Sequence, residues 1–94
     1  MTVKVPLGQI VVTQGILQWM APDIRRGRWV ADILHRHQQG DWGDVDAGDR
    51  RTNDRARRRG GRLFSVYHYE DGTTVWVITE ADRSITTVLL PDEY

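Results

Sequence analysis

Three strand-like stretches at the C-terminal end of the chain constrain the fold most strongly. Residues 62–69 and 73–79 are rich in aromatic and β-branched residues, and a Glu-Asp-Gly turn lies between them. Glycine adopts the positive φ of a tight hairpin, so the two stretches predict an antiparallel pair. Residues 84–90 repeat this composition after the polar segment 80–83. The whole run therefore predicts a three-stranded antiparallel meander.

Both faces of this meander carry apolar side chains. Successive side chains of a strand point to opposite faces, and in the first strand Phe64 and Val66 alternate with Leu63 and Tyr67. One face of the sheet packs against helices in a domain of this size, which leaves a second, partly apolar face. Two alternatives follow. A dimer mate or another protein covers the second face, or helices and the N-terminal segment wrap both sides.

Helical patterns occupy the first half of the chain. Residues 9–13 are a short strand candidate, and the Thr13 hydroxyl is placed to cap a helix over residues 14–21. Asp23 is a candidate cap for a second helix. The clearest part of that helix is residues 28–38, where apolar side chains recur at helical spacing and form a core-facing stripe.

A polar segment connects these helices to the meander. Residues 40–49, GDWGDVDAGD, have no helical or strand period and predict a loop. Trp42 is the one large apolar side chain of this loop, and we expect it to anchor the loop to the core; a ligand contact is the alternative. Residues 49–59 predict a very polar surface helix that ends at a pair of glycines, residues 60–61.

The order of these elements predicts the fold class. We expect one α+β domain over residues 1–94, because 94 residues supply a single modest core. Its sheet is a three- or four-stranded antiparallel sheet built on the C-terminal meander. Two or three helices pack on one face of that sheet.

Composition sets the expected compartment. The chain has no cysteine, so neither a disulfide nor a thiolate metal site is expected. No stretch approaches the roughly 20 apolar residues of a membrane span, and the first residues do not form a secretion signal. We therefore expect a cytoplasmic protein with no membrane partner.

Charged residues are segregated although the net charge is zero. Residues 22–62 contain eleven arginines and seven aspartates, whereas residues 63–94 contain one arginine and six acids. The basic residues that suggest nucleic-acid binding are Arg50, Arg51, Arg55, Arg57, Arg58, Arg59 and Arg62. Neighbouring aspartates at helical spacing favour a self-paired, solvated helix, and a protein contact is a further alternative. We expect nucleic acid to be the less favoured partner.

No pattern in the sequence indicates catalysis or a cofactor. His35 and His37 would point roughly 200° apart on a helix, so they do not chelate one metal ion. The aspartates of residues 40–49 lack the spacing of a calcium loop. The two serines, Ser65 and Ser84, lie in strand-like stretches without a nucleophile motif. The sequence therefore predicts a non-enzyme with no catalytic residue, no metal site and no cofactor.

Several motifs are specific enough to carry a family resemblance. They are the loop GDWGDVDAGD, the pair Asn53 and Ala56, the segment GRLFS at residues 61–65 and the ending TVWVITEADRSITTVLLPDEY. Over residues 7–15 and 40–94 the chain resembles a family of short, uncharacterised bacterial proteins found on plasmids, phages and other mobile elements, sometimes catalogued beside type I restriction systems. It departs from the family at Arg57, where a leucine is expected, and in its middle segment.

The resemblance implies a small, non-enzymatic accessory protein of a mobile element that binds a host protein. Accessory proteins of this kind include inhibitors of CRISPR or restriction machinery. Two other classes remain open: a nucleic-acid-binding regulator that uses the arginine-rich helix, and a small-molecule-binding or sponge protein. Clustered acids beside exposed aromatic rings favour a basic protein partner, and a homodimer through the second sheet face is also expected. The expected partner-binding residues are Tyr67, Tyr69, Glu70, Asp71, Trp76, Glu80, Asp82, Arg83, Asp92 and Glu93.

Overall fold

The computed structural model describes residues 4–94. The first half of the chain contains one strand and three helices: β1 (Gln9–Val12), α1 (Gln14–Met20), α2 (Ile24–Gln38) and α3 (Ala47–Arg59). The second half contains three strands and a one-turn 3-10 helix: β2 (Leu63–His68), β3 (Thr74–Thr79), β4 (Ile85–Leu89) and η1 (Pro91–Glu93). The predicted α+β class is confirmed.

The four strands form a single sheet in the order β1-β4-β3-β2. Strands β2, β3 and β4 are the predicted antiparallel meander, whereas β1 joins β4 in parallel. The sheet is therefore mixed, and the prediction of an entirely antiparallel sheet is wrong for the fourth strand. The physical reason is the long connection from β1 to the meander, since parallel neighbours need a crossover rather than a hairpin.

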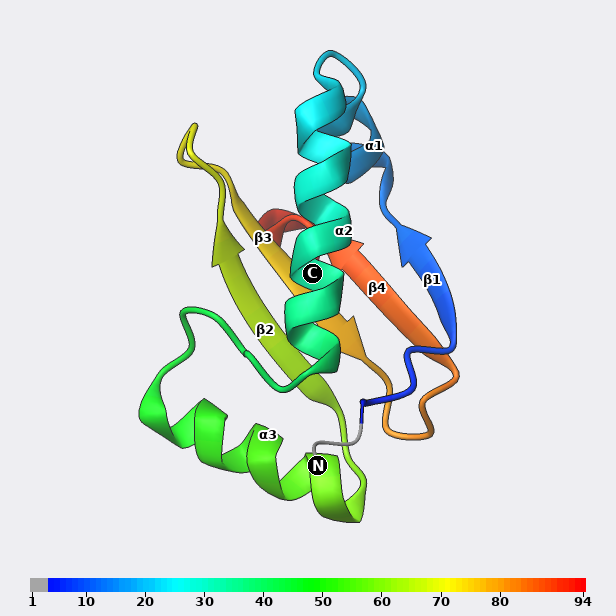
Figure 1. Ribbon diagram of the computed structural model, residues 1–94, viewed down its shortest axis with the longest axis vertical. Coiled ribbons are helices and arrows are strands. Elements are labelled where there is room, and N and C mark those ends of the chain that lie inside the picture. Colours follow the sequence, from blue (N-terminus) through cyan, green and yellow to red (C-terminus); the bar gives the residue numbers. More distant parts are fainter. Residues whose placement is uncertain (1–3) are drawn as a thin grey trace.

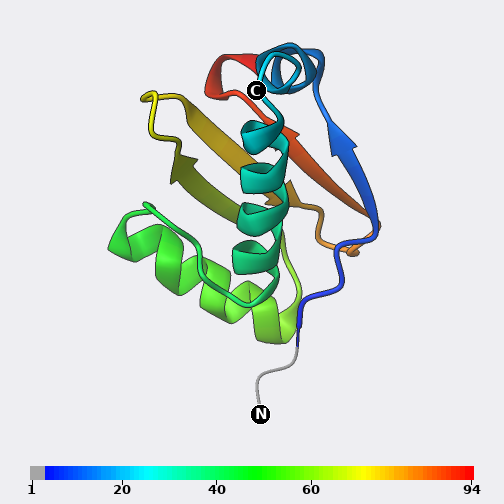
Figure 2. The same ribbon diagram turned by 45° about the horizontal axis from the view of Figure 1, so that its top comes forward.

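Helices α1 and α2 cover one face of the sheet, with α2 running across the middle of it (Figure 1). Figure 2 shows the same layering from a second direction, with α3 beyond the β2 edge. The core between the layers consists of buried apolar side chains from both: Ile16, Val30, Ile33, Tyr67, Val75, Val77 and Val88. Within the described residues, no helix has the length and apolarity needed to cross a membrane.

The strand register assigns the apolar residues of the meander to faces. Val66 lies opposite Trp76, and Tyr67 lies opposite Val75. Directly opposed residues share a face, so Trp76 and Tyr67 are on different sides of the sheet. Tyr67 is 2% exposed in the core and donates its hydroxyl hydrogen to the Asp41 carbonyl oxygen, 2.6 Å away. Two of the predicted partner-binding residues, Tyr67 and Trp76, therefore lie on opposite faces of the sheet, and Tyr67 is buried.

Side-chain caps decide where the helices begin. The Thr13 hydroxyl accepts from the Ile16 N–H, as predicted, and Asp23 accepts from the Arg25 N–H, so α2 begins at Ile24. Asp46 accepts from the Asp49 N–H, which starts α3 two residues before the predicted helix. The predicted loop is correspondingly shorter. Trp42 within it is 2% exposed, which confirms the expected anchor.

The outer edge of β2 is closed by the loop before α3 and by α3 itself. The Val66 N–H donates to the Trp42 carbonyl oxygen, and the Asp44 N–H donates to the Val66 carbonyl oxygen. Gly43 lies between these two contacts with φ of 71°, and a Cβ there would overlap the Val66 carbonyl oxygen. The amide of Asn53 on α3 bonds both the N–H and the carbonyl of Phe64. The N–H and carbonyl groups of Phe64 and Val66 at this edge are therefore satisfied.

Candidate functional site

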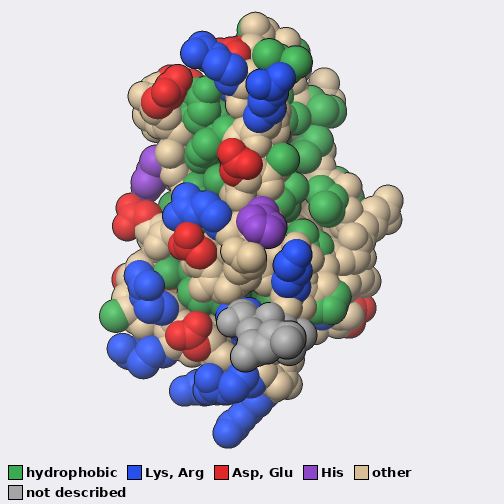
Figure 3. Space-filling view, viewed as in Figure 1, with side chains coloured by type: hydrophobic (Ala, Val, Ile, Leu, Met, Phe, Trp, Pro, Cys, Tyr) green, Lys and Arg blue, Asp and Glu red, His purple; other side chains and the backbone are tan. Residues whose placement is uncertain are grey.

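The exposed side of α3 carries more arginines than any other residue type, and the exposed Asp54 lies among them. Asn53 and Ala56 are buried, and at 100° per residue the opposite half of the helix carries five exposed arginines. We call this set the arginine face: Arg50, Arg51, Arg55, Arg58 and Arg59. Figure 3 shows basic side chains gathered at the lower end of the molecule, where Figure 1 places α3.

The arginines of the arginine face lie near aspartates but form no ion pairs with them in the described residues. Within residues 4–94, no ion pair joins any of its five guanidinium groups to an acid. Asp46 caps the helix through the Asp49 N–H, and Asp54 accepts from the indole N–H of Trp42 at 2.9 Å. The expected intrahelical ion pairs are therefore wrong for the arginine face, because Asp46 and Asp54 make other contacts.

Three contacts fix α3 against the sheet. Asn53 bonds the backbone of β2, and the Trp42–Asp54 hydrogen bond ties the preceding loop to the helix. At the other end, the Arg83 guanidinium donates to the carbonyl oxygens of Ala56 and Gly61 at 2.9 and 2.6 Å. A cation at a helix C-terminus also interacts favourably with the helix dipole. These contacts hold the helix that carries the arginine face against the rest of the domain.

A basic hollow of about 400 Å3 adjoins the arginine face. Lys4, Arg57, Arg58 and Arg83 line it together with one acid, Asp54. Arg57 is partly buried and lies against Gly40, where a Cβ would meet its guanidinium. Glycine at position 40 therefore leaves the room that this bulky side chain occupies.

The C-terminal acids that we expected to bind a partner are mostly engaged within the molecule. Glu93 accepts hydrogen bonds from the Thr13 hydroxyl and from the N–H groups of Leu90 and Gly15. The Thr13 hydrogen bond makes the largest contribution to lowering the pKa of Glu93 below its ordinary value. This carboxylate ties the C-terminus to the start of α1, which is a structural role.

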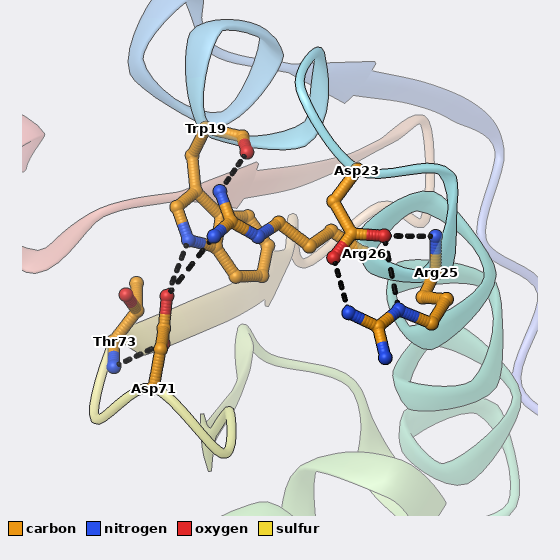
Figure 4. Close-up of polar contacts among 6 residues, drawn as sticks. All are labelled: Trp19, Asp23, Arg25, Arg26, Asp71 and Thr73. Carbon is orange, nitrogen blue, oxygen red and sulfur yellow. Dashed lines mark hydrogen bonds and ion pairs between the residues drawn. The ribbon is translucent and has the colours of Figure 1, made fainter.

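Asp71 at the tip of the β2–β3 hairpin is held by two elements (Figure 4). It accepts from the Thr73 N–H and from the indole N–H of Trp19, and it faces the Arg26 guanidinium at 3.7 Å. The Thr73 N–H is the main cause of the lowered pKa of Asp71. Arg26 also donates to the Trp19 carbonyl oxygen, so the hairpin tip is pinned to α1 and α2.

The remaining members of the expected partner site are dispersed. Tyr69 packs edge-on against Trp19 and Trp29, on the other side of the sheet from Trp76. Asp82 accepts from Ser84 in the β3–β4 turn, where the Ser84 hydroxyl lowers its pKa most, and Glu80 pairs with Arg62 at 3.3 Å. Glu70 and Asp92 are exposed. The ten predicted partner-binding residues therefore do not form one continuous surface.

The sheet face opposite α1 and α2 carries an apolar hollow of about 250 Å3. Phe64, Trp76, Ile78, Tyr94 and Arg62 line it, and the rings of Phe64 and Tyr94 both meet Trp76 edge-on. Of these residues, only Trp76 was among the predicted protein-binding residues. The sequence signal that could have found Phe64 and Ile78 is the alternation of side chains along each strand. The strand register is needed as well, because it shows that these two residues lie on the same face of the sheet.

A chain of buried hydroxyls surrounds His37 in the core. Its Nδ1 lies 2.6 Å from the Ser65 hydroxyl and its Nε2 lies 2.8 Å from the Thr79 hydroxyl, while Thr79 contacts Thr86, which donates to the Leu7 carbonyl. This direction of donation assigns the proton to Nε2. Burial lowers the pKa of His37 to about 4, so the ring is neutral.

The buried chain has the spacing of a nucleophile and a base but not their accessibility. His37 and Ser65 are both 0% exposed, so substrate does not reach them. Elsewhere, His68 pairs with Asp44 on the surface at 2.8 Å. Among residues 4–94, no group of three or more histidine and acidic side chains is arranged to hold a metal ion.

Comparison of the chain with protein-family models, with curated proteins and with solved structures finds no match in any of the three.

Proposed function

We propose that this chain is a non-enzymatic binding protein that recognises the phosphate backbone of a nucleic acid through the arginine face of α3. The observation that carries the proposal is the set of five exposed guanidinium groups without carboxylate partners in the described part of the chain. Guanidinium groups form bidentate hydrogen bonds with phosphate oxygens, and a cluster of arginines without ion-pair partners attracts a polyanion.

The spacing along the helix supports a backbone contact. Arg51, Arg55 and Arg59 follow one another at intervals of four residues, so neighbouring guanidinium groups leave the helix about 6 Å apart along its axis. Such a row follows a strand of phosphates. Contacts to phosphate oxygens carry no sequence information directly, whereas arginine reads sequence only where it reaches a guanine edge in the major groove. We therefore propose binding with little sequence preference.

The test is a titration of a fluorescent DNA duplex, a single strand and an RNA with the protein, followed by anisotropy. The double variant Arg51→Ala/Arg55→Ala should weaken binding at least about tenfold, since hydrogen bonds to charged groups contribute about 1.5–3 kcal/mol each. Its matched control is Arg25→Ala/Arg28→Ala, which removes two exposed arginines from α2. Equal losses in both variants, or no binding by the parent, would contradict the proposal.

A second candidate function is the docking of a protein on the helix-free sheet face. The observation that favours it is the apolar hollow around Trp76, because interfaces concentrate their binding energy in aromatic anchors that fill or form pockets. Trp76→Ala should then abolish co-purification of a host protein and leave DNA binding unchanged. A host protein retained equally by parent and variant would remove this candidate.

The resemblance to mobile-element proteins suggests a biological role for either of the two proposed binding surfaces. An arginine face that occupies DNA or RNA, or an aromatic face that occupies a host protein, suits an accessory that interferes with CRISPR or restriction machinery. The corresponding measurement is a plasmid-interference assay with parent, Arg51→Ala/Arg55→Ala and Trp76→Ala chains. Equal interference with and without the chain would reject the inhibitor role while leaving the binding measurement to stand on its own.

A further inference from the structure

The two edges of the sheet differ in how their backbone groups are satisfied. At β2, Phe64 and Val66 find partners in Asn53 and in the loop around Trp42. At β1, the N–H groups of Gln9 and Thr13 donate inward to Ser84 and Val88 of the neighbouring segment. The backbone alternates along a strand, so the N–H and carbonyl groups of Ile10 and Val12 point away from the sheet. Among residues 4–94, no other strand pairs with this edge.

The segment around β1 is short but lacks the charged residues and prolines that protect many edge strands from pairing. Residues 7–21 contain no charged residue and no proline, although the chain has 26 charged residues in all. Natural edges are usually protected by lysine, proline, a bulge or a covering element. This edge therefore presents pairing groups without electrostatic repulsion.

Exposed apolar side chains gather at the same edge. Ile10 is 49% exposed and Val11 is 38% exposed on β1, and Ile85, which is in register with Gln9, is 37% exposed. Leu17, on the helix that follows β1, is 52% exposed. Figure 3 shows apolar side chains along the upper right of the molecule, on the side of α2 where Figure 1 places β1.

We propose that β1 is a dimerisation edge at which a second copy of this chain pairs in antiparallel fashion across a two-fold axis at Val11. An isologous interface requires a patch that complements itself. An uncharged strand with outward donors and acceptors meets that requirement, because two copies meet without like charges. The two sheets become one continuous eight-stranded sheet, and the arginine face of each α3 lies beyond the β2 edge, away from the new interface.

The outward groups select the register. An axis at Val11 places Ile10 opposite Val12 of the second copy and Val12 opposite its Ile10, which gives four backbone hydrogen bonds. An axis at Ile10 would require Gly8 to pair with Val12, yet Gly8 has φ of 63° and lies before the strand. An axis at Val12 would pair Ile10 with Gln14, which is already in α1. The Val11 register is therefore the one that uses all the outward groups.

Single cysteines test this register directly because the natural chain has none. In the proposed dimer Val11 faces Val11 in a non-hydrogen-bonded pair, with Cα atoms about 4.5 Å apart, a separation that permits a disulfide. The matched control is Gln9→Cys, on the same face of β1, whose two copies would be about 13 Å apart. Under mild oxidation Val11→Cys should form a disulfide-linked dimer and Gln9→Cys should not. Equal linkage of both variants, or none in Val11→Cys, would overturn the proposal.

A pair of variants at Ile10 shows whether dimerisation depends on backbone hydrogen bonds or on contact between apolar side chains. Ile10→Pro removes an outward N–H and leaves the inward ladder of Gln9 and Thr13 intact, while Ile10→Ala keeps the N–H and removes the side chain. In sedimentation equilibrium the parent should approach twice the 10.9 kDa of one chain. Ile10→Pro should give the single-chain mass, and Ile10→Ala should still dimerise at higher concentration. A parent that remains a monomer throughout would overturn the proposal, even if another protein adds a strand at this edge.

Discussion

The arginine face of α3 and the C-terminal acids are both clusters of like charge in the sequence, one positive and one negative. In the structure, the two clusters make different kinds of contact. Asp71, Asp82 and Glu93 accept hydrogen bonds from nearby backbone N–H groups and hold turns and termini in place. The guanidinium groups of the arginine face have no such contacts to acids in the described residues. A charge cluster indicates a binding surface only after its internal partners have been accounted for.

The difference has a physical cause. The short side chain of an aspartate in a turn lies close to the turn backbone. It can therefore accept hydrogen bonds from N–H groups that have no other partner. An arginine on the solvent side of a helix finds the backbone already paired and has only side chains or an external anion to contact. Arg83 illustrates the exception, because it lies beside the carbonyls that end α3 and binds them.

The largest effect on the free energy of unfolding is expected when Trp42, which ties the loop before α3 to that helix, is replaced. Trp42→Ala should lower the free energy of unfolding by about 3–5 kcal/mol, because the ring is buried and its N–H holds Asp54. Chemical denaturation with matched Trp76→Ala measures the difference, since Trp76 is only partly buried. An equal loss in the two variants would mean that the loop does not anchor α3.

Acid should destabilise the protein in two stages. The pKa of His37 is about 4 in the fold against an ordinary 6.5, so the unfolded chain takes up a proton first as the pH falls. The free energy of unfolding should therefore fall by about 3 kcal/mol between pH 6.5 and pH 4. Urea titrations across this range test the loss, and His35→Gln should keep the same profile because His35 is exposed.

The second stage belongs to the carboxylates. Hydrogen bonds lower the pKa of Asp71, Asp82 and Glu93, so their stabilising effect is present above the ordinary carboxyl pKa and is lost as the pH falls through their lowered values. Glu93→Gln should reduce the melting temperature and flatten the most acidic part of the profile. Asp92→Asn, a neighbouring exposed acid, should leave both unchanged. Similar melting temperatures for the two variants would mean that the hydrogen bonds of Glu93 do not stabilise the fold.

The smallest effect on stability is expected at the arginine face itself. Arg51→Ala/Arg55→Ala should change the free energy of unfolding by less than about 0.5 kcal/mol per site, because exposed helix positions without fixed partners contribute little. Thermal melts of this variant and of Arg25→Ala/Arg28→Ala provide the comparison. A large loss in the first variant would show that these arginines hold the fold together.

The fold was largely predictable from the sequence because its patterns are local. The meander, the Thr13 and Asp23 caps and the buried Trp42 follow from turn chemistry, helical spacing and the size of one ring. The parallel pairing of β1 and the register that separates Tyr67 from Trp76 depend on contacts between distant segments. The site was also hard to predict, because residue spacing shows only where a charge lies along a helix or strand. It does not show that the Trp42 indole N–H donates a hydrogen bond to Asp54.

The most direct test of the arginine face is the salt dependence of duplex DNA binding. Five phosphate contacts predict a slope of about −4.5 for the logarithm of the association constant against the logarithm of salt concentration. Arg51→Ala/Arg55→Ala should reduce the magnitude of that slope by about 2, since each lost phosphate contact removes about one. Arg25→Ala/Arg28→Ala should retain the parent slope. A slope that is the same in all three chains, or close to zero in the parent, would contradict the account.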